Sequence, residues 1–154
     1  MVENKITDLT VTSSAFSHEG VIPSKYTCDG EAINPSLKIE DIPEVVQTLA
    51  IIVEDPDAPK GTFDHWLVWN IPASENYIAE NENPGVSGTN SAGKTGYHPP
   101  CPPHGTHRYY FNVYGLNDRL SIEPGAKKEE LLKAMQPHLI AKGSLMGKYS
   151  REGK

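Results

Sequence analysis

Five polar side chains with acid–base or hydrogen-bonding chemistry stand at the ends of apolar segments of the chain. They are Asp55, Asp57, His65, His107 and Tyr109. Because the ends of neighbouring strands meet at one rim of a β-sandwich, we expect these side chains to converge on one site. His107 and Tyr109 are two residues apart, so they lie on the same face of their predicted strand.

Two imidazoles, a phenol hydroxyl and nearby backbone N–H groups are hydrogen-bond donors, and donors around a cavity suit an anion such as a phosphoryl group. A carboxylate at hydrogen-bond distance would hold an imidazole in one tautomer and raise its pKa, which favours the cation. The stretch 96–115 adds four prolines, three histidines and a cysteine. This composition predicts a rigid loop that lowers the entropic cost of keeping a pocket open.

Two of these assignments have structural alternatives. Asp55, Pro56 and Asp57 together are typical of a turn, in which aspartate side chains accept hydrogen bonds from the following backbone N–H groups. His65 precedes Trp66 and is equally consistent with a hydrogen-bonded histidine in the core. Both alternatives stay open on the sequence alone.

A metal site and a cysteine nucleophile are two further alternatives. His104 and His107 form an H-x-x-H pair, and the side chains of Asp55, Asp57 and His65 are also of ligand types. The pair is not on a helix and its spacing is poor for ligands on a strand, so we expect no metal. Cys101 could pair with His107 as a nucleophile, but it stands between prolines with no activating helix N-terminus.

The composition limits the class of protein. The chain of 154 residues predicts one domain, 1–154, and its 13 Gly and 13 Pro predict many turns and little helix. A net charge of −6 argues against nucleic acid or an anionic membrane as partner. No leader-like segment and no apolar run of about 18 residues is present, so we expect a soluble cytoplasmic protein. Its two cysteines show no CxxC spacing and predict free thiols, with a disulfide only after oxidation.

Short β segments dominate the expected elements. Alternating or continuously apolar stretches predict strands at 9–13, 36–40, 49–53, 65–72, 108–116 and 144–150. The run 49–53 is apolar throughout, which indicates a strand buried on both faces. One helix is predicted over 127–143, interrupted by Pro137 and capped by Gly143. Together these features indicate a mostly β protein, a β-sandwich.

The motifs resemble one known family. They are "DPDAP" (55–59), "DHWLVWN" (64–70) and "CPPHGTHRYYFNVYGL" (101–116), with "FSHEGVIPSKYTCDGEAINPSL" (16–37) before them and "LLKAMQPHLIAKGSLMGKYSR" (131–151) after them. In this order and at these separations they are similar to the phosphatidylethanolamine-binding protein family, and most similar to its bacterial and archaeal Raf kinase inhibitor-like branch. Relatives usually have Gly at the position of Pro99 and often an aromatic residue at that of Ala92.

The resemblance implies a Greek-key β-sandwich of two antiparallel sheets with one or two short helices and an anion-binding cavity at one end. It assigns ligand binding to Asp55, His65, the backbone of Cys101, His107 and Tyr109. It assigns the pocket rim to Asp57, Pro59, Trp66, Pro102 and Pro103. It also implies that Cys28 and Cys101 are near neighbours.

The function implied is binding of a small anion, a phosphoryl group or a phospholipid head group, without a cofactor. A protein kinase or serine protease that the chain inhibits, a signalling role as a scaffold, and a homodimer are also expected from the resemblance. The alternative is a hydrolase acting on phosphoesters, in which His65 and His107, assisted by aspartate, form an acid–base pair.

Overall fold

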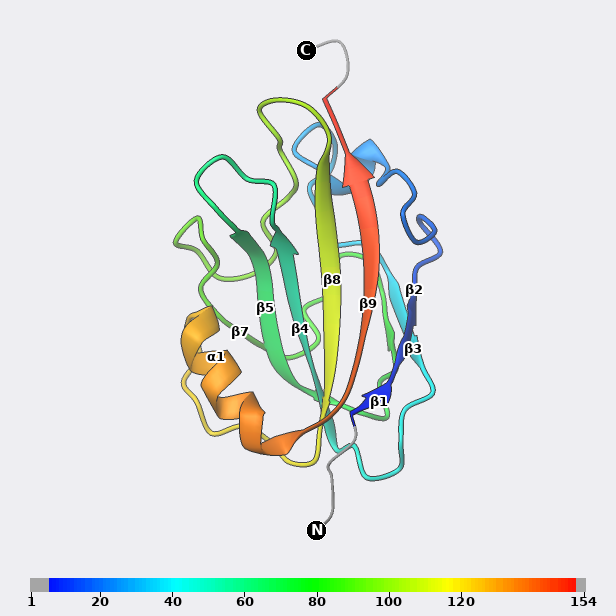
Figure 1. The fold of residues 1–154 in the computed structure, drawn as a ribbon, viewed down its shortest axis with the longest axis vertical. Helices are drawn as coiled ribbons and strands as arrows, with labels where there is room; N and C mark the ends of the chain where they lie inside the picture. The colour runs from blue at the N-terminus through cyan, green and yellow to red at the C-terminus, as the bar shows by residue number, and fades with distance from the viewer. Residues whose placement is uncertain (1–5, 152–154) are drawn as a thin grey trace.

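The computed structural model describes residues 6–151 and shows a mostly β fold of two sheets with one α-helix (Figure 1). The larger sheet has the strand order β1-β9-β8-β4-β5-β7. Its strands are β1 (Thr7–Asp8), β4 (Thr48–Asp55), β5 (Phe63–Pro72), β7 (Val86–Ser87), β8 (His107–Leu116) and β9 (Leu139–Tyr149). The smaller sheet consists of β2 (Thr10–Thr12), β3 (Leu37–Glu40) and β6 (Tyr77–Ile78), in that order.

The predicted β-sandwich is confirmed, with one difference in strand direction. β4 pairs antiparallel with both β5 and β8, although β5, β6 and β7 come between β4 and β8 in the chain, and this crossover is the Greek-key element of the fold. β1, by contrast, pairs parallel with β9, so the larger sheet is mixed and not purely antiparallel.

β4 is the most buried strand, and its two faces pack against different parts of the molecule. Leu49, Ile51 and Val53 point into the core between the two sheets. Ala50 and Ile52 point to the opposite face, where helix α1 (Lys128–Met135) covers the sheet (Figure 1). The apolar run therefore lacks alternation because both faces of the strand are buried, as its sequence predicts.

The helix is shorter than its sequence pattern predicts. α1 ends at Met135, and Pro137 lies in a 3-10 turn, Gln136–His138, from which β9 starts directly. Gly143 is therefore not a helix cap but a residue of β9, and a β-carbon there would lie 2.3 Å from the carbonyl oxygen of Leu9. Proline lacks the N–H that a continuing helix needs, which explains the early end.

The segment 73–96 contains the short strands β6 and β7 between turns and is not the uniform loop that its composition suggests. Each of these strands covers only two residues, too few for an alternation pattern to show in the sequence. Within the described part of the chain, no helix has the length and apolar character needed to cross a membrane.

Candidate binding pocket

The predicted site residues gather where three strands of the larger sheet end together. The last residue of β4, Asp55, pairs with Phe63 at the start of β5, and Glu54 pairs with Tyr110 near the start of β8. A cavity of about 210 Å³ opens at this edge, and we call it the rim pocket. It is lined by Asp55, Ala58, Pro59, Phe63, His65, His98, Pro99, Cys101, Pro102, Pro103, His107 and Tyr109.

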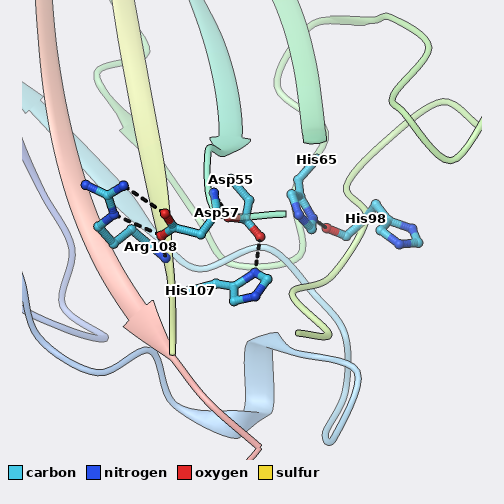
Figure 2. A network of polar contacts seen from close by, with 6 residues as sticks. All are labelled: Asp55, Asp57, His65, His98, His107 and Arg108. Atoms are coloured by element: carbon cyan, nitrogen blue, oxygen red, sulfur yellow. Dashed lines mark hydrogen bonds and ion pairs between the residues drawn. The ribbon is translucent and has the colours of Figure 1, made fainter. Parts of the chain in front are cut away.

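Asp55 and His107 form a buried pair in the rim pocket. His107 Nδ1 donates to Asp55 Oδ2 over 2.6 Å, and both side chains are more than 90% buried (Figure 2). The other carboxylate oxygen, Oδ1, accepts the backbone N–H of Asp57 at 2.7 Å. Asp55 therefore accepts the hydrogen bond typical of an aspartate turn and also lines the rim pocket, so the two alternatives left open by the sequence do not exclude each other. The pair leaves His107 Nε2 as the ring nitrogen available to a ligand.

His65 is held in one tautomer by the backbone of His98. Its Nδ1 lies 2.8 Å from the carbonyl oxygen of His98, and the N–H of His98 donates back to the carbonyl oxygen of His65 over 2.8 Å. A carbonyl oxygen only accepts, so the proton of neutral His65 resides on Nδ1 and Nε2 carries a lone pair. Figure 2 shows the ring of His65 between Asp55 and the His98 carbonyl.

Burial keeps the His65 imidazole uncharged near neutral pH. The side chain has lost most of its solvent, which lowers its pKa to about 4 despite the hydrogen bond to His98, which raises the pKa. The expectation that His65 serves as a hydrogen-bond donor to the ligand does not fit this tautomer, because near neutral pH its Nε2 offers an acceptor. The Tyr109 hydroxyl can donate, and His107, whose Nδ1 proton is committed to Asp55, donates from Nε2 only as the imidazolium.

Tyr109 presents a buried hydroxyl group that makes no well-formed hydrogen bond among residues 6–151, although the Asp55 carboxylate lies close enough to interact with it. The residue is fully buried, and its ring contacts both histidines, edge-on to His65 at 5.3 Å and stacked with His107 at 6.4 Å between ring centroids. Burial and the charge of Asp55 raise the pKa of this hydroxyl, so it stays protonated. A buried hydroxyl without a partner costs free energy, and a ligand in the rim pocket would provide that partner.

Apolar side chains form the rest of the wall. Phe63 packs its ring against His65 and His98, with centroid separations of 4.8 and 5.4 Å. Pro59 and the prolines of the stretch 99–103 complete the lining. The rim pocket thus combines a few polar groups with a stiff apolar wall, which is the usual composition of a small-molecule site.

The proline-rich wall, residues 97–103, is linked to residues 26–28 at three points. The Tyr97 hydroxyl donates to the carbonyl oxygen of Tyr26 at 2.9 Å, and the N–H of Cys28 donates to the carbonyl oxygen of Pro100 at 3.0 Å. A disulfide joins Cys28 to Cys101, with Cα atoms 5.4 Å apart. The expected proximity of the two cysteines is confirmed, whereas the expectation of free thiols is wrong.

Asp57 and Trp66, both predicted on the rim, lie outside this lining. Asp57 binds the guanidinium of Arg108 in a two-point contact of 2.8 and 2.9 Å, which lowers the pKa of its carboxyl group to about 2. Trp66 is 1% exposed, packs in the core between the sheets and meets Tyr97 edge-on. The register of β4 against β5 shifts between Val53 and Glu54, which leaves His65 unpaired, so strict alternation does not apply here; Trp66 pairs with Val53 and packs in the core beside the rim pocket without lining it.

Four residues of the lining were not assigned from the sequence, namely Ala58, Phe63, His98 and Pro99, and neither was the hydrogen bond of the His98 carbonyl oxygen. Phe63 stands two residues before His65 on β5, so strand alternation places both on one face and could have identified it. Ala58 lies within the "DPDAP" motif. The contact of the His98 carbonyl oxygen with His65 could not be predicted, because the two residues are 33 positions apart and a backbone group does not depend on the residue type.

The H-x-x-H pair does not come together in the rim pocket. His104 is exposed and is not part of the lining. Across residues 6–151, no group of three or more His, Cys, Asp or Glu side chains is arranged to hold a metal ion.

A mostly β sandwich with a small, partly polar pocket at the strand ends of its larger sheet defines the class of this protein. The family model for phosphatidylethanolamine-binding protein matches residues 12–150, and the chain belongs to this family. A UPF0098 protein of Pyrococcus abyssi is 47% identical over 94% of this chain and 87% of its own length. A UPF0098 protein of Chlamydia trachomatis is 45% identical over 94% of this chain and 100% of its own length.

Two solved structures share the fold. A phosphatidylethanolamine-binding protein homolog from Chlamydia trachomatis aligns with a TM-score of 0.91 at 44% identity and covers 97% of this chain and 100% of its own. Escherichia coli YbcL, described as a member of the mammalian PEBP family, aligns with a TM-score of 0.86 at 25% identity, covering 94% of this chain and 99% of its own.

Proposed function

We propose that the chain binds a small oxyanion of the phosphoryl class in the rim pocket. The observation that carries this proposal is the hydroxyl of Tyr109, which is buried, protonated and without a well-formed hydrogen bond next to the Asp55–His107 pair. This hydroxyl and an imidazolium at His107, paired with Asp55, are two donors suited to the oxygens of an anion. Free phosphate and the head group of a phospholipid share this chemistry.

The size and wall of the rim pocket limit the ligand. A cavity of about 210 Å³ is smaller than the roughly 300–1,000 Å³ of sites for drug-sized molecules, so it suits a single head group. The net charge of −6 opposes anion binding at long range, and binding therefore depends on the local donors. We expect affinity to be modest for inorganic phosphate and to gain from an apolar substituent that contacts Phe63 and Pro99.

Titration calorimetry with inorganic phosphate tests this function. Tyr109→Phe and His107→Ala should each weaken binding by about tenfold to a hundredfold, because each removes one donor to the anion. His104→Gln, at an exposed position outside the lining, is the matched control and should bind like the wild type. If both site variants bound phosphate with wild-type affinity, the anion site would have to lie elsewhere in the protein.

A hydrolase acting on phosphoesters is the second candidate, favoured by the orientation of His107 through Asp55. In this function Asp55 holds the His107 imidazole, and the neutral His65 on the other side would accept a proton. Turnover of bis(p-nitrophenyl) phosphate by the wild type, lost in His107→Ala, would support it. Turnover that survives the substitution would come from a contaminant. We favour binding without turnover, since the site offers no identified nucleophile.

The finer roles expected from the resemblance stay predictions. Inhibition of a protein kinase or a serine protease needs a partner assay, and a homodimer needs a measurement of mass in solution. A cytoplasmic location is also untested, and the Cys28–Cys101 disulfide argues against a reducing compartment. Trapping of thiols in intact cells would show whether this disulfide exists where the protein works.

A further inference from the structure

The hydrogen-bonding groups of the rim pocket are not all donors, and this limits which oxyanions fit. His65 Nδ1 is bound to the carbonyl oxygen of His98, so its Nε2 must accept a hydrogen bond when the ring is neutral. The side chain is 5% exposed, and no second hydrogen bond of its ring is recorded within residues 6–151. Its Nε2 lone pair is not among the fully buried atoms without a partner, so in the rim pocket its hydrogen bond comes from solvent or from a ligand that replaces the solvent.

Loss of solvent keeps the His65 ring neutral in spite of the carboxylates near it. The charged or titratable groups near it come from β4, β5, β8 and the proline-rich wall, and they are Asp55, Asp64, His98, His107 and Tyr109. Both Asp55 and Asp64 favour protonation, but loss of solvent outweighs them. Asp55 is also bound to His107, and Asp64 forms an ion pair with Lys128, so neither carboxylate is free to hold a proton on His65 Nε2.

We infer that the rim pocket selects oxyanions that themselves carry a proton, such as hydrogen phosphate or the monoanion of a phosphate monoester, over sulfate and phosphodiesters. This inference rests on the proposed function. The O–H of the ligand donates to His65 Nε2, while its other oxygens accept from Tyr109 and, when the ring of His107 is an imidazolium, from His107 Nε2. Sulfate and a phosphodiester offer only acceptors, and an oxygen lone pair against the His65 lone pair is repulsive.

Hydrogen phosphate and sulfate at pH 8 give the sharpest comparison, because both are tetrahedral dianions and only hydrogen phosphate carries a proton. Calorimetry on the wild type should show hydrogen phosphate binding about tenfold or more tightly than sulfate, since a buried acceptor left without its donor is costly. Methyl phosphate should bind better at pH 5.5 than at pH 8, where it has lost its proton, whereas inorganic phosphate keeps a proton at both values.

His65→Gln provides the matched perturbation. A glutamine amide can turn either its oxygen or its nitrogen toward the ligand, so the ratio of phosphate to sulfate affinity should fall to near one, with a gain for sulfate. His104→Gln should keep the wild-type ratio. The wild-type comparison of anions tests the inference even if His65→Gln does not fold.

The outcomes separate this inference from the function on which it rests. Equal affinity of the wild type for hydrogen phosphate and sulfate would leave the anion site in place and overturn the requirement for a proton. An unchanged preference for phosphate in a folded His65→Gln variant would also overturn it, because the selectivity would then arise elsewhere. Failure of the wild type to bind any phosphate would instead overturn the proposed function itself.

Discussion

Replacement of His65 by glutamine tests whether the buried imidazole is uncharged in the folded protein. The pKa of His65 is about 4 in the folded chain, against about 6.5 for an exposed histidine. Between these two values the unfolded chain binds a proton that the folded chain does not bind. Stability is therefore complete above about pH 6.5, falls as the pH decreases through this window, and levels off below about pH 4.

The magnitude follows from proton linkage. For one group with these two pKa values, the free energy of unfolding decreases by about 2 kcal/mol between pH 7 and pH 4.5. Glutamine does not titrate, so the decrease should be smaller by that amount in His65→Gln, whatever the absolute stability of the variant. Comparing the pH-dependent change in the free energy of unfolding between wild type and variant therefore separates the effect of proton uptake from the effect of lost packing.

Urea denaturation at pH 7 and pH 4.5, in chloride buffers free of phosphate and sulfate, measures this difference. The exposed His104→Gln variant controls for the removal of any histidine and should lose as much stability as the wild type. Equal losses in wild type and His65→Gln would refute the reasoning, because they would show that His65 takes up its proton in the folded state as readily as in the unfolded state.

Three other substitutions have expected outcomes. Cys28→Ser removes the disulfide between positions 73 residues apart and should lower the free energy of unfolding by about 2–4 kcal/mol in urea; an unchanged midpoint would mean that the wild type is reduced under the assay. Leu131→Ala should lower the free energy of unfolding by about 2–5 kcal/mol, because the side chain of Leu131 is fully buried. Leu132 is exposed, so Leu132→Ala should lower it far less. Similar decreases in the two variants would contradict the packing of α1. Tyr109→Phe should leave the melting temperature unchanged or raise it slightly, because the buried hydroxyl makes no well-formed hydrogen bond, and a large drop would show that its interaction with Asp55 stabilises the fold.

Long apolar or alternating segments made most of the larger sheet predictable. The run 49–53 predicts β4 correctly because burial on both faces requires apolar residues without interruption. The helix was overextended because leucines on one helical face continue to Leu139, although Pro137 had already removed a hydrogen bond that the helix needs. The two-residue strands β6 and β7 were not identifiable, since so short a segment has no period.

Side chains of the candidate site were easier to predict than the backbone that orients them. Asp55, His107 and Tyr109 lie at strand ends, where the sequence alone indicates convergence. The tautomer of His65 depends on a carbonyl oxygen in the proline-rich wall, and no residue type predicts a backbone contact of this kind. The sequence analysis therefore assigned His65 as a donor, whereas the contact makes it an acceptor near neutral pH.

The start of β8 places three consecutive residues on two sides of the sheet. His107 and Tyr109 line the rim pocket, while Arg108 between them points outward and forms an ion pair with Asp57 (Figure 2). A strand repeats every two residues, so one inserted or deleted residue at this point would exchange the two sides: arginine would enter the pocket, and both aromatic side chains would face solvent. We therefore expect length variation among natural homologues in the turns before this strand, where the chain can absorb it, and strict length within the strand itself. In a library of single-residue deletions across 97–116, we expect an abrupt change at the start of the strand, from variants that still bind phosphate to variants that do not.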